Sequence, residues 1–183
     1  MRTLPVTLTL LFASLGGLDA EAPFHRSSAV GLNEDIEEVR ELLTDPPQGE
    51  LTELKTAVLE RSSRPSVVLI ELASDPMSLA RVRILSLALL SEFPTPDVKA
   101  YLLARVENTA LHPTFRGWAL QSYARGFAAT EPEQVQKVVE PYLTDLEPGL
   151  RARAEMAMEY TRQDRSGGSS DPMKPMISLL LED

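Results

Sequence analysis

One pattern of apolar, basic and small residues occurs three times along the chain at nearly constant spacing. In each copy an apolar residue precedes an arginine, a small residue follows that arginine by three positions, and an apolar residue follows it by seven. The arginines are Arg83, Arg116 and Arg151, which lie 33 and 35 residues apart. Such a period is typical of stacked helix pairs, because a single pair cannot bury its apolar side alone. The pattern therefore predicts an α-helical repeat protein.

Prolines and capping residues divide the rest of the sequence into further helices. Between these breaks, apolar residues recur at spacings of three and four, which is the period of a helix buried on one side. Residues 67–70 have the β-branched content of a strand. Helical segments surround them, however, so a short helix is expected there. The predicted helices are 33–44, 51–60, 67–72, 76–90, 96–106, 113–127, 131–143, 148–160 and a last one within 171–183.

The repeated motif resembles the second helix of HEAT repeats, including the bacterial HEAT-like repeats related to phycobiliprotein lyases. The resemblance covers residues 33–160 as about four antiparallel helix pairs, of which the last three carry the motif, and the predicted solenoid spans residues 33–163. In that family the pairs stack into a right-handed α-solenoid, and the concave face usually binds a protein partner. The resemblance implies an all-α fold here, namely a short HEAT-like α-solenoid followed by a terminal helix, with a scaffold or interaction role.

Four residues of the motif copies are candidate partner-binding residues. Arg83, Arg116 and Arg151 would either bond carbonyls and acids between stacked helices or form a row that meets an acidic ligand. Trp118 follows Arg116 by two positions. An exposed tryptophan beside an arginine would be an anchor for a partner, because such side chains dominate binding energies at interfaces.

The N-terminus has the pattern of a secretory signal peptide. Arg2 supplies one positive charge, residues 4–18 carry no charge, and Ala20 offers a small residue at the cleavage point. The apolar run is shorter than the roughly twenty residues that a membrane helix needs. We therefore expect residues 1–20 to be removed during export to the periplasm or the medium, leaving no membrane span. An uncleaved N-terminal helix, buried or membrane-anchoring, is the alternative.

Two segments beside the solenoid have the composition of loops. Residues 21–32 contain proline, serine and glycine without an apolar period, and are an expected flexible lead-in. Residues 164–170 end in two glycines and two serines, and are an expected flexible spacer. The apolar helix in 171–183 would then cap the final repeat, bind a partner elsewhere or join copies of the chain in an envelope structure.

Composition and charge exclude or disfavour several classes of function. The 183 residues contain no cysteine, so thiolate metal sites, thiol nucleophiles and disulfides are excluded. Eighteen basic and 27 acidic residues give a net charge of −9, which disfavours nucleic acid as a ligand. The acids are densest in residues 34–41, which form either a solvated helix face or a patch for a basic partner. His112 precedes Pro113 and is expected to cap a helix rather than bind a metal.

These observations favour a non-catalytic module that binds a protein partner outside the cytoplasm and needs no cofactor. The sequence contains none of the common motifs of zinc hydrolases, serine hydrolases, dinucleotide sites or phosphate loops. The alternative is an enzyme or enzyme accessory subunit of HEAT-like lyase type, which only the family resemblance implies. A cleft of convergent polar groups with shifted pKa values would favour that alternative.

Overall fold

The computed structural model describes residues 24–47 and 50–166, and all regular structure within them is helical. The predicted all-α fold class is confirmed, and the segment predicted as a short helix rather than a strand is α3. Residues 1–20 and 171–183, predicted as a signal peptide and a terminal helix, lie outside the described residues. The elements are α1 (Phe24–Thr44), α2 (Leu51–Arg61), α3 (Pro65–Ser74), α4 (Ala80–Leu90), α5 (Pro96–Glu107), α6 (Pro113–Phe127), α7 (Pro132–Val139), the 3-10 helix η1 (Glu140–Thr144) and α8 (Pro148–Ser166).

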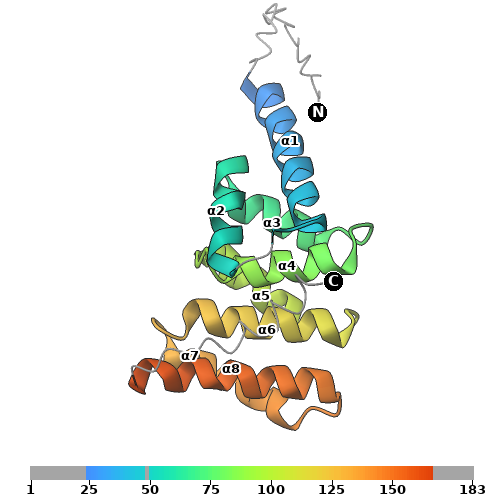
Figure 1. The fold of residues 1–183 in the computed structure, drawn as a ribbon. Helices are drawn as coiled ribbons and strands as arrows, with labels where there is room; N and C mark the ends of the chain where they lie inside the picture. Colours follow the sequence, from blue (N-terminus) through green and yellow to red (C-terminus); the bar gives the residue numbers. More distant parts are fainter. Residues whose placement is uncertain (1–23, 48–49, 167–183) are drawn as a thin grey trace, which may run out of the picture.

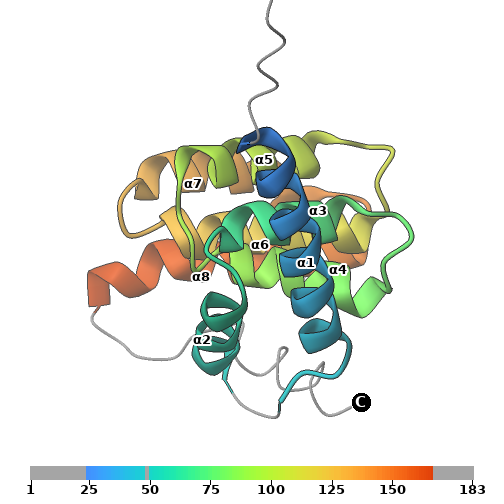
Figure 2. The same ribbon diagram turned by 90° about the horizontal axis from the view of Figure 1, so that it is seen from above.

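Successive helices pack in pairs, and the pairs stack along one direction (Figure 1). In three pairs, α3 packs on α4, α5 on α6, and α7 with η1 on α8. The second helices α4, α6 and α8 lie side by side in one layer, and the first helices α3, α5 and α7 form the other (Figure 2). At one end α1 contacts α3 and α4, and α2 contacts α1 and α4. The arrangement is a short, solenoid-like stack.

The first helix begins earlier than the sequence predicted. It starts at Phe24, within the segment that was expected to be a flexible lead-in, and continues to Thr44. Leu32, one residue before the predicted start, extends the apolar stripe of Ile36 and buried Val39 and packs against the core, which explains the helical turn around it. The extension from Leu32 back to Phe24 has no such contact to explain it among the described side chains. The other end differs in the same way, because α8 continues to Ser166 and takes up part of the expected spacer.

Helix α4 begins later than predicted, at Ala80 rather than at Pro76. Asp75 does accept a backbone hydrogen bond, but from the N–H of Met77 at 2.9 Å, and its other oxygen accepts from the Ser78 hydroxyl at 2.8 Å. Arg40 on α1 holds the same carboxylate at 3.0 Å. These bonds fold the chain into a tight turn, because an aspartate side chain that bonds the backbone two residues on competes with helix formation. Pro76 therefore lies in the loop before α4 and not in its first turn.

Polar bonds repeat between neighbouring pairs at about the period of the sequence motif. Arg105 on α5 donates to the Ser74 hydroxyl of α3 at 2.6 Å, across 31 residues. Arg125 on α6 donates to the Ser91 hydroxyl at the end of α4 at 2.7 Å, across 34 residues. Since each bond joins one pair to the next, the stack is held together by nearest-neighbour contacts, as in other repeat proteins.

The second helices approach one another closely at two glycines of α6, where there is no Cβ atom in the way. A Cβ at Gly126 of α6 would lie 3.1 Å from the backbone oxygen of Ser91, at the end of α4. A Cβ at Gly117 of the same helix would lie 2.8 Å from Cγ of Arg153 on α8. The contact at Gly117 is the shorter and meets the base of the Arg153 side chain, whereas the contact at Gly126 meets backbone, which cannot rotate aside. Glycine is therefore needed at both positions.

Gly126→Ala should lower the free energy of unfolding by about 1 kcal/mol, because the added methyl group overpacks against fixed backbone. The matched control is Gly31→Ala in α1, where nothing lies within 4 Å of the added Cβ. That change should raise the free energy of unfolding by about 0.5–1 kcal/mol, since alanine is the better helix former. Urea unfolding followed by circular dichroism measures both, and equal effects would show that the α4–α6 approach is not tight.

No described helix, in 24–47 or 50–166, has both the length and the apolar character that crossing a membrane requires.

Candidate interaction surface

The motif arginines bond inside their own helix pairs. The Nε–H of Arg83 donates to the carbonyl oxygen of Ala73 at 3.4 Å, and the Nε–H of Arg116 donates to that of Val106 at 3.0 Å. The acceptor is ten residues before the arginine in both pairs, near the end of the first helix. Arg151 differs, because its Nη1 donates to the carbonyl of Asp145 at 2.7 Å, in the loop before α8. Each arginine thus satisfies a carbonyl that the end of a helix or a loop leaves without a partner.

Two of these arginines also cover aromatic rings. The guanidinium of Arg83 lies 3.9 Å from the ring centre of Phe115 on the next pair, and that of Arg116 lies 5.9 Å from the ring centre of Tyr142. Cation–π contacts of this kind add to the packing between pairs. The contacts favour the structural role that the sequence left open for the row of arginines over contact with a ligand.

Trp118 is buried, which corrects the expectation of an exposed anchor. Only 2% of the residue is exposed. The guanidinium of Arg153 on α8 lies 3.6 Å from the centre of its ring. The physical reason is the position of Trp118 two residues after Arg116, which turns it by about 200° to the opposite side of α6. The two residues therefore belong to different faces, and they do not form one site.

The residues two, six and nine positions after each motif arginine form what we call the inner face. Because these offsets correspond to about 180–240° of helix rotation, they point away from the first-helix layer that the arginines contact. The offsets select the same side of all three second helices, which lie side by side. The inner face comprises Leu85, Leu89 and Glu92 on α4, Trp118, Ser122 and Arg125 on α6, and Arg153, Ala157 and Tyr160 on α8.

The inner face combines an apolar strip with two cations. Its leucines, Ala157 and Trp118 supply the strip. Arg125 forms an ion pair with Glu92 and bonds the hydroxyl of Ser91. Arg153 donates to the side-chain oxygen of Gln121 at 2.5 Å, and no carboxylate of the described residues lies within ion-pair distance of it.

Burial lowers the pKa of Arg153 to about 10, and Tyr160 opposes that change. The guanidinium remains charged at neutral pH, because that pKa is still well above 7. A partly buried cation without an anionic partner is costly. Arg153 therefore provides a place where a carboxylate from another segment would be stabilised. Sequence reasoning missed this residue, although its offset from Arg151 equals that of Trp118 from Arg116.

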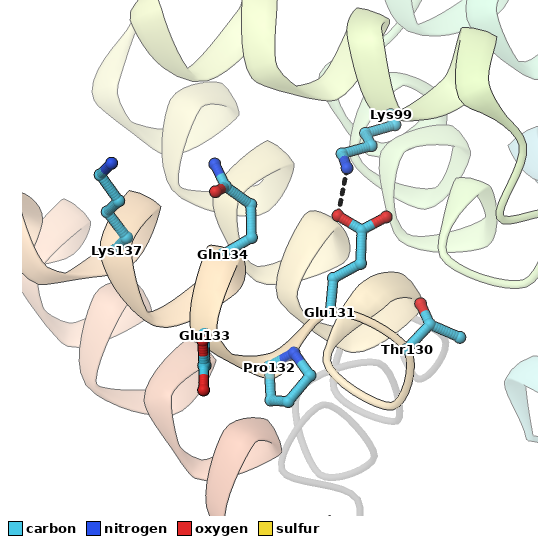
Figure 3. Close-up of a pocket in the computed structure, with 7 residues that line it drawn as sticks. All are labelled: Lys99, Thr130, Glu131, Pro132, Glu133, Gln134 and Lys137. Carbon is cyan, nitrogen blue, oxygen red and sulfur yellow. Dashed lines mark hydrogen bonds and ion pairs between the residues drawn. The ribbon is translucent and has the colours of Figure 1, made fainter.

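A hollow lies on the other side of the stack, in the layer of first helices, where α5 meets the start of α7 (Figure 3). Its volume is about 680 Å³, and an ion pair between Lys99 and Glu131 crosses it. Exposed charged and amide groups line the rest, including Glu133, Gln134 and Lys137. Because the two central charges already neutralise each other, and the other charged groups of the lining, Glu133 and Lys137, are exposed to solvent, the hollow has no buried unpaired charge among the described residues that would select a ligand.

The acidic segment of α1 contributes to a groove against α2. Glu38, Glu41 and Asp45 line a hollow of about 650 Å³ together with Glu60 and Arg61 of α2. Other acids of the segment are used within the fold: Asp35 accepts a hydrogen bond from the Ser62 hydroxyl at 2.7 Å, for example. The dense acidic segment is therefore partly structural and partly a solvated face.

The remaining groups with shifted pKa values are far from one another. Hydrogen bonds from the Met77 backbone, Arg40 and Ser78 lower the pKa of Asp75 from 3.8 to about 2. Burial raises the pKa of the Tyr123 phenol on α6, and the charge of Glu131 adds to that effect.

His112 caps α6, accepting at Nδ1 from the Thr114 N–H at 3.3 Å, as predicted. Within the described part of the chain, no three histidine, aspartate or glutamate side chains are grouped to hold a metal ion.

Comparisons with family models, curated proteins and solved structures find no match to this chain.

Proposed function

We propose that this chain is a non-catalytic interaction module of the HEAT-like solenoid type, which binds a protein partner through its inner face. The observation that carries the proposal is the inner face itself. Three successive helix pairs place apolar side chains and two arginines at equivalent positions on one side of the stack. Repeat proteins use such extended surfaces for binding, because equivalent positions of successive repeats form one continuous strip.

The chemistry of the inner face defines the kind of segment it would accept. The apolar strip formed by Leu85, Leu89 and Trp118 is buried in this structure, and once uncovered it would suit a segment with several aliphatic or aromatic side chains. Arg153 lies beside this strip and pairs with no carboxylate of residues 24–47 and 50–166. A guanidinium binds a carboxylate through paired hydrogen bonds, so the preferred segment would have an acidic group next to its apolar residues.

The positions of the titratable groups support the interaction role over the enzyme alternative. Asp75 is in the loop after α3, Tyr123 is in the core of α6, and Arg153 is on the inner face of α8. General acid–base chemistry needs two such groups within reach of one reacting atom. In the described residues these three groups do not converge on one cleft, and nothing in their geometry favours a catalytic role.

The location outside the cytoplasm rests on the sequence of residues 1–20. A cleaved signal would leave the exported protein beginning at Glu21, and N-terminal sequencing of the exported protein tests this part of the proposal. A protein that begins at Met1 would contradict it.

Crosslinking in cells tests the interaction role. The chain is crosslinked in its native envelope, captured, and compared with Arg153→Gln and with Arg162→Gln. Arg162 is the matched control, because it is exposed on the same helix and pairs only locally with Glu159. We expect Arg153→Gln to reduce the captured partner about tenfold, the effect of losing about 1.4 kcal/mol of binding free energy, and Arg162→Gln to leave it unchanged. Equal capture by all three proteins would contradict the role of the inner face.

A further inference from the structure

The apolar part of the inner face is buried although none of the surrounding described helices lies on it. The helices α4 and α8 flank α6, and α5 and α7 contact it from the first-helix side. Nevertheless, every residue from 117 to 124 of α6 is buried. Trp118 is 2% exposed and Ser122 is 0% exposed, and both point away from the first-helix layer. Leu85 and Leu89 on α4 and Ala157 on α8 are likewise 0% exposed.

Described contacts account for only part of this burial. The guanidinium of Arg153 covers one side of the Trp118 ring. Helix α2 reaches the edge of the face, where Lys55 pairs with Glu92 at 3.2 Å. Neither contact covers the strip between α6 and α8. The hydroxyl of Ser122 has no hydrogen-bond partner in the described part of the chain, which is costly for a polar group that water does not reach.

The chain beyond α8 has the right length and starting point to cover this face. Helix α8 ends at Ser166, in the same layer as α6 and α4. Four glycine and serine residues follow, and these span up to roughly 13 Å at about 3.3 Å each. Residues 171–183 would span about 20 Å as a helix. Neighbouring helices pack at about 8–10 Å, so that length crosses from α8 to α4.

The same segment has a chemistry complementary to the inner face. It carries Met176 and Ile177 and a run of three leucines, Leu179 to Leu181, which match an apolar strip. It also carries Glu182 and Asp183. These groups supply the anion that Arg153 lacks among its described partners. The two other candidates are unsuitable, because residues 1–20 are expected to be cleaved and residues 48–49 are too few.

We propose that residues 171–183 of the same chain dock on the inner face and so compete with the protein partner. The competition rests on the proposed function, whereas the docking does not. A linker of only four residues would hold the segment at an effective concentration in the millimolar range. A partner therefore binds with its intrinsic affinity multiplied by the fraction of molecules whose face is open. The segment sets how tightly a partner must bind to displace it.

Trp118 is the only tryptophan of the chain, so its fluorescence reports on the inner face directly. The full chain is compared with Leu180→Asp, which places a charge within the apolar run of the segment. We expect a red-shifted emission and stronger quenching by acrylamide in Leu180→Asp. The matched control is Leu146→Asp, because Leu146 is 96% exposed in the loop before α8. Emission and quenching that stay the same in Leu180→Asp would overturn the docking.

A chain that ends at Ser170 gives an independent test. Its Trp118 should be quenched as strongly as in Leu180→Asp, and a synthetic peptide of residues 171–183 should restore the protection. A peptide of the same composition in scrambled order should have no effect. If either altered chain has a reduced helical circular dichroism, its thermal unfolding is followed by the remaining helical signal, with and without the peptide, in place of fluorescence. A raised Tm then supports docking, and an unchanged Tm overturns it.

Two further measurements separate the possible failures. Quenching of Trp118 in the full chain should not depend on protein concentration, and a dependence would overturn docking within one chain in favour of exchange between copies. Leu180→Asp should increase the amount of partner captured by crosslinking, because it opens the face. If Trp118 becomes exposed while capture is unchanged, the docking stands and partner binding at this face is refuted.

Discussion

Replacing Leu120 with alanine should lower the free energy of unfolding by about 2–5 kcal/mol. Leu120 is 0% exposed and lies at the centre of α6, the helix that contacts both neighbouring second helices and two first helices. Removing its side chain leaves a cavity that several helices would have to move together to fill, because each is fixed by its own pair. Urea unfolding followed by circular dichroism measures the effect.

The control for Leu120→Ala is Leu146→Ala. The second leucine is 96% exposed in the loop before α8, so its truncation should change the free energy of unfolding by no more than about 0.5 kcal/mol. A loss below 1 kcal/mol for Leu120→Ala would mean that α6 is not the central helix of a stacked core.

Ala119→Leu should lower the free energy of unfolding by about 1–3 kcal/mol, because it overpacks the space between helices. Ala119 is the small residue of the repeated motif, three positions after Arg116, and it is 0% exposed. The matched control is Ala104→Leu on α5, where the alanine is exposed. Thermal and urea unfolding of both variants give the comparison. Unchanged melting of Ala119→Leu would contradict close packing of α6 in the layer of second helices.

The sequence predicted those helices best whose ends are set by local chemistry. Helix α6 runs from Pro113 to Phe127 as expected, because His112 caps its first turn and a proline occupies its first position. The start of α4 was wrong, since the bonds that turn Asp75 away from a helix come partly from Arg40, 35 residues earlier. The predicted start of α1 was wrong as well. Leu32 packs against the core, but this contact forms only when α1 lies against the other helices, so the local sequence does not reveal it.

The candidate surface was predicted less completely than the fold. The three motif arginines were found because their spacing is regular, but the acceptors that give them structural partners are backbone carbonyls, which no side-chain pattern reveals. The exposure of Trp118 was misjudged because it depends on rotation around α6. Arg153 was missed because its partners, Gln121 and Trp118, come from a neighbouring pair and become visible only when the pairs are stacked.

The bonds of Arg83 and Arg116 to carbonyls ten residues earlier have a consequence for how the chain folds. A loop of about ten residues closes in roughly 10–100 ns, far faster than contacts between distant parts of a chain form. In each of these two pairs, the arginine–carbonyl bond can therefore form before the pair contacts its neighbouring pairs. Chains rich in such local contacts have a low contact order and fold quickly. We expect the contacts between pairs, such as the approach of α6 to the end of α4 at Gly126, to form later than these local ones.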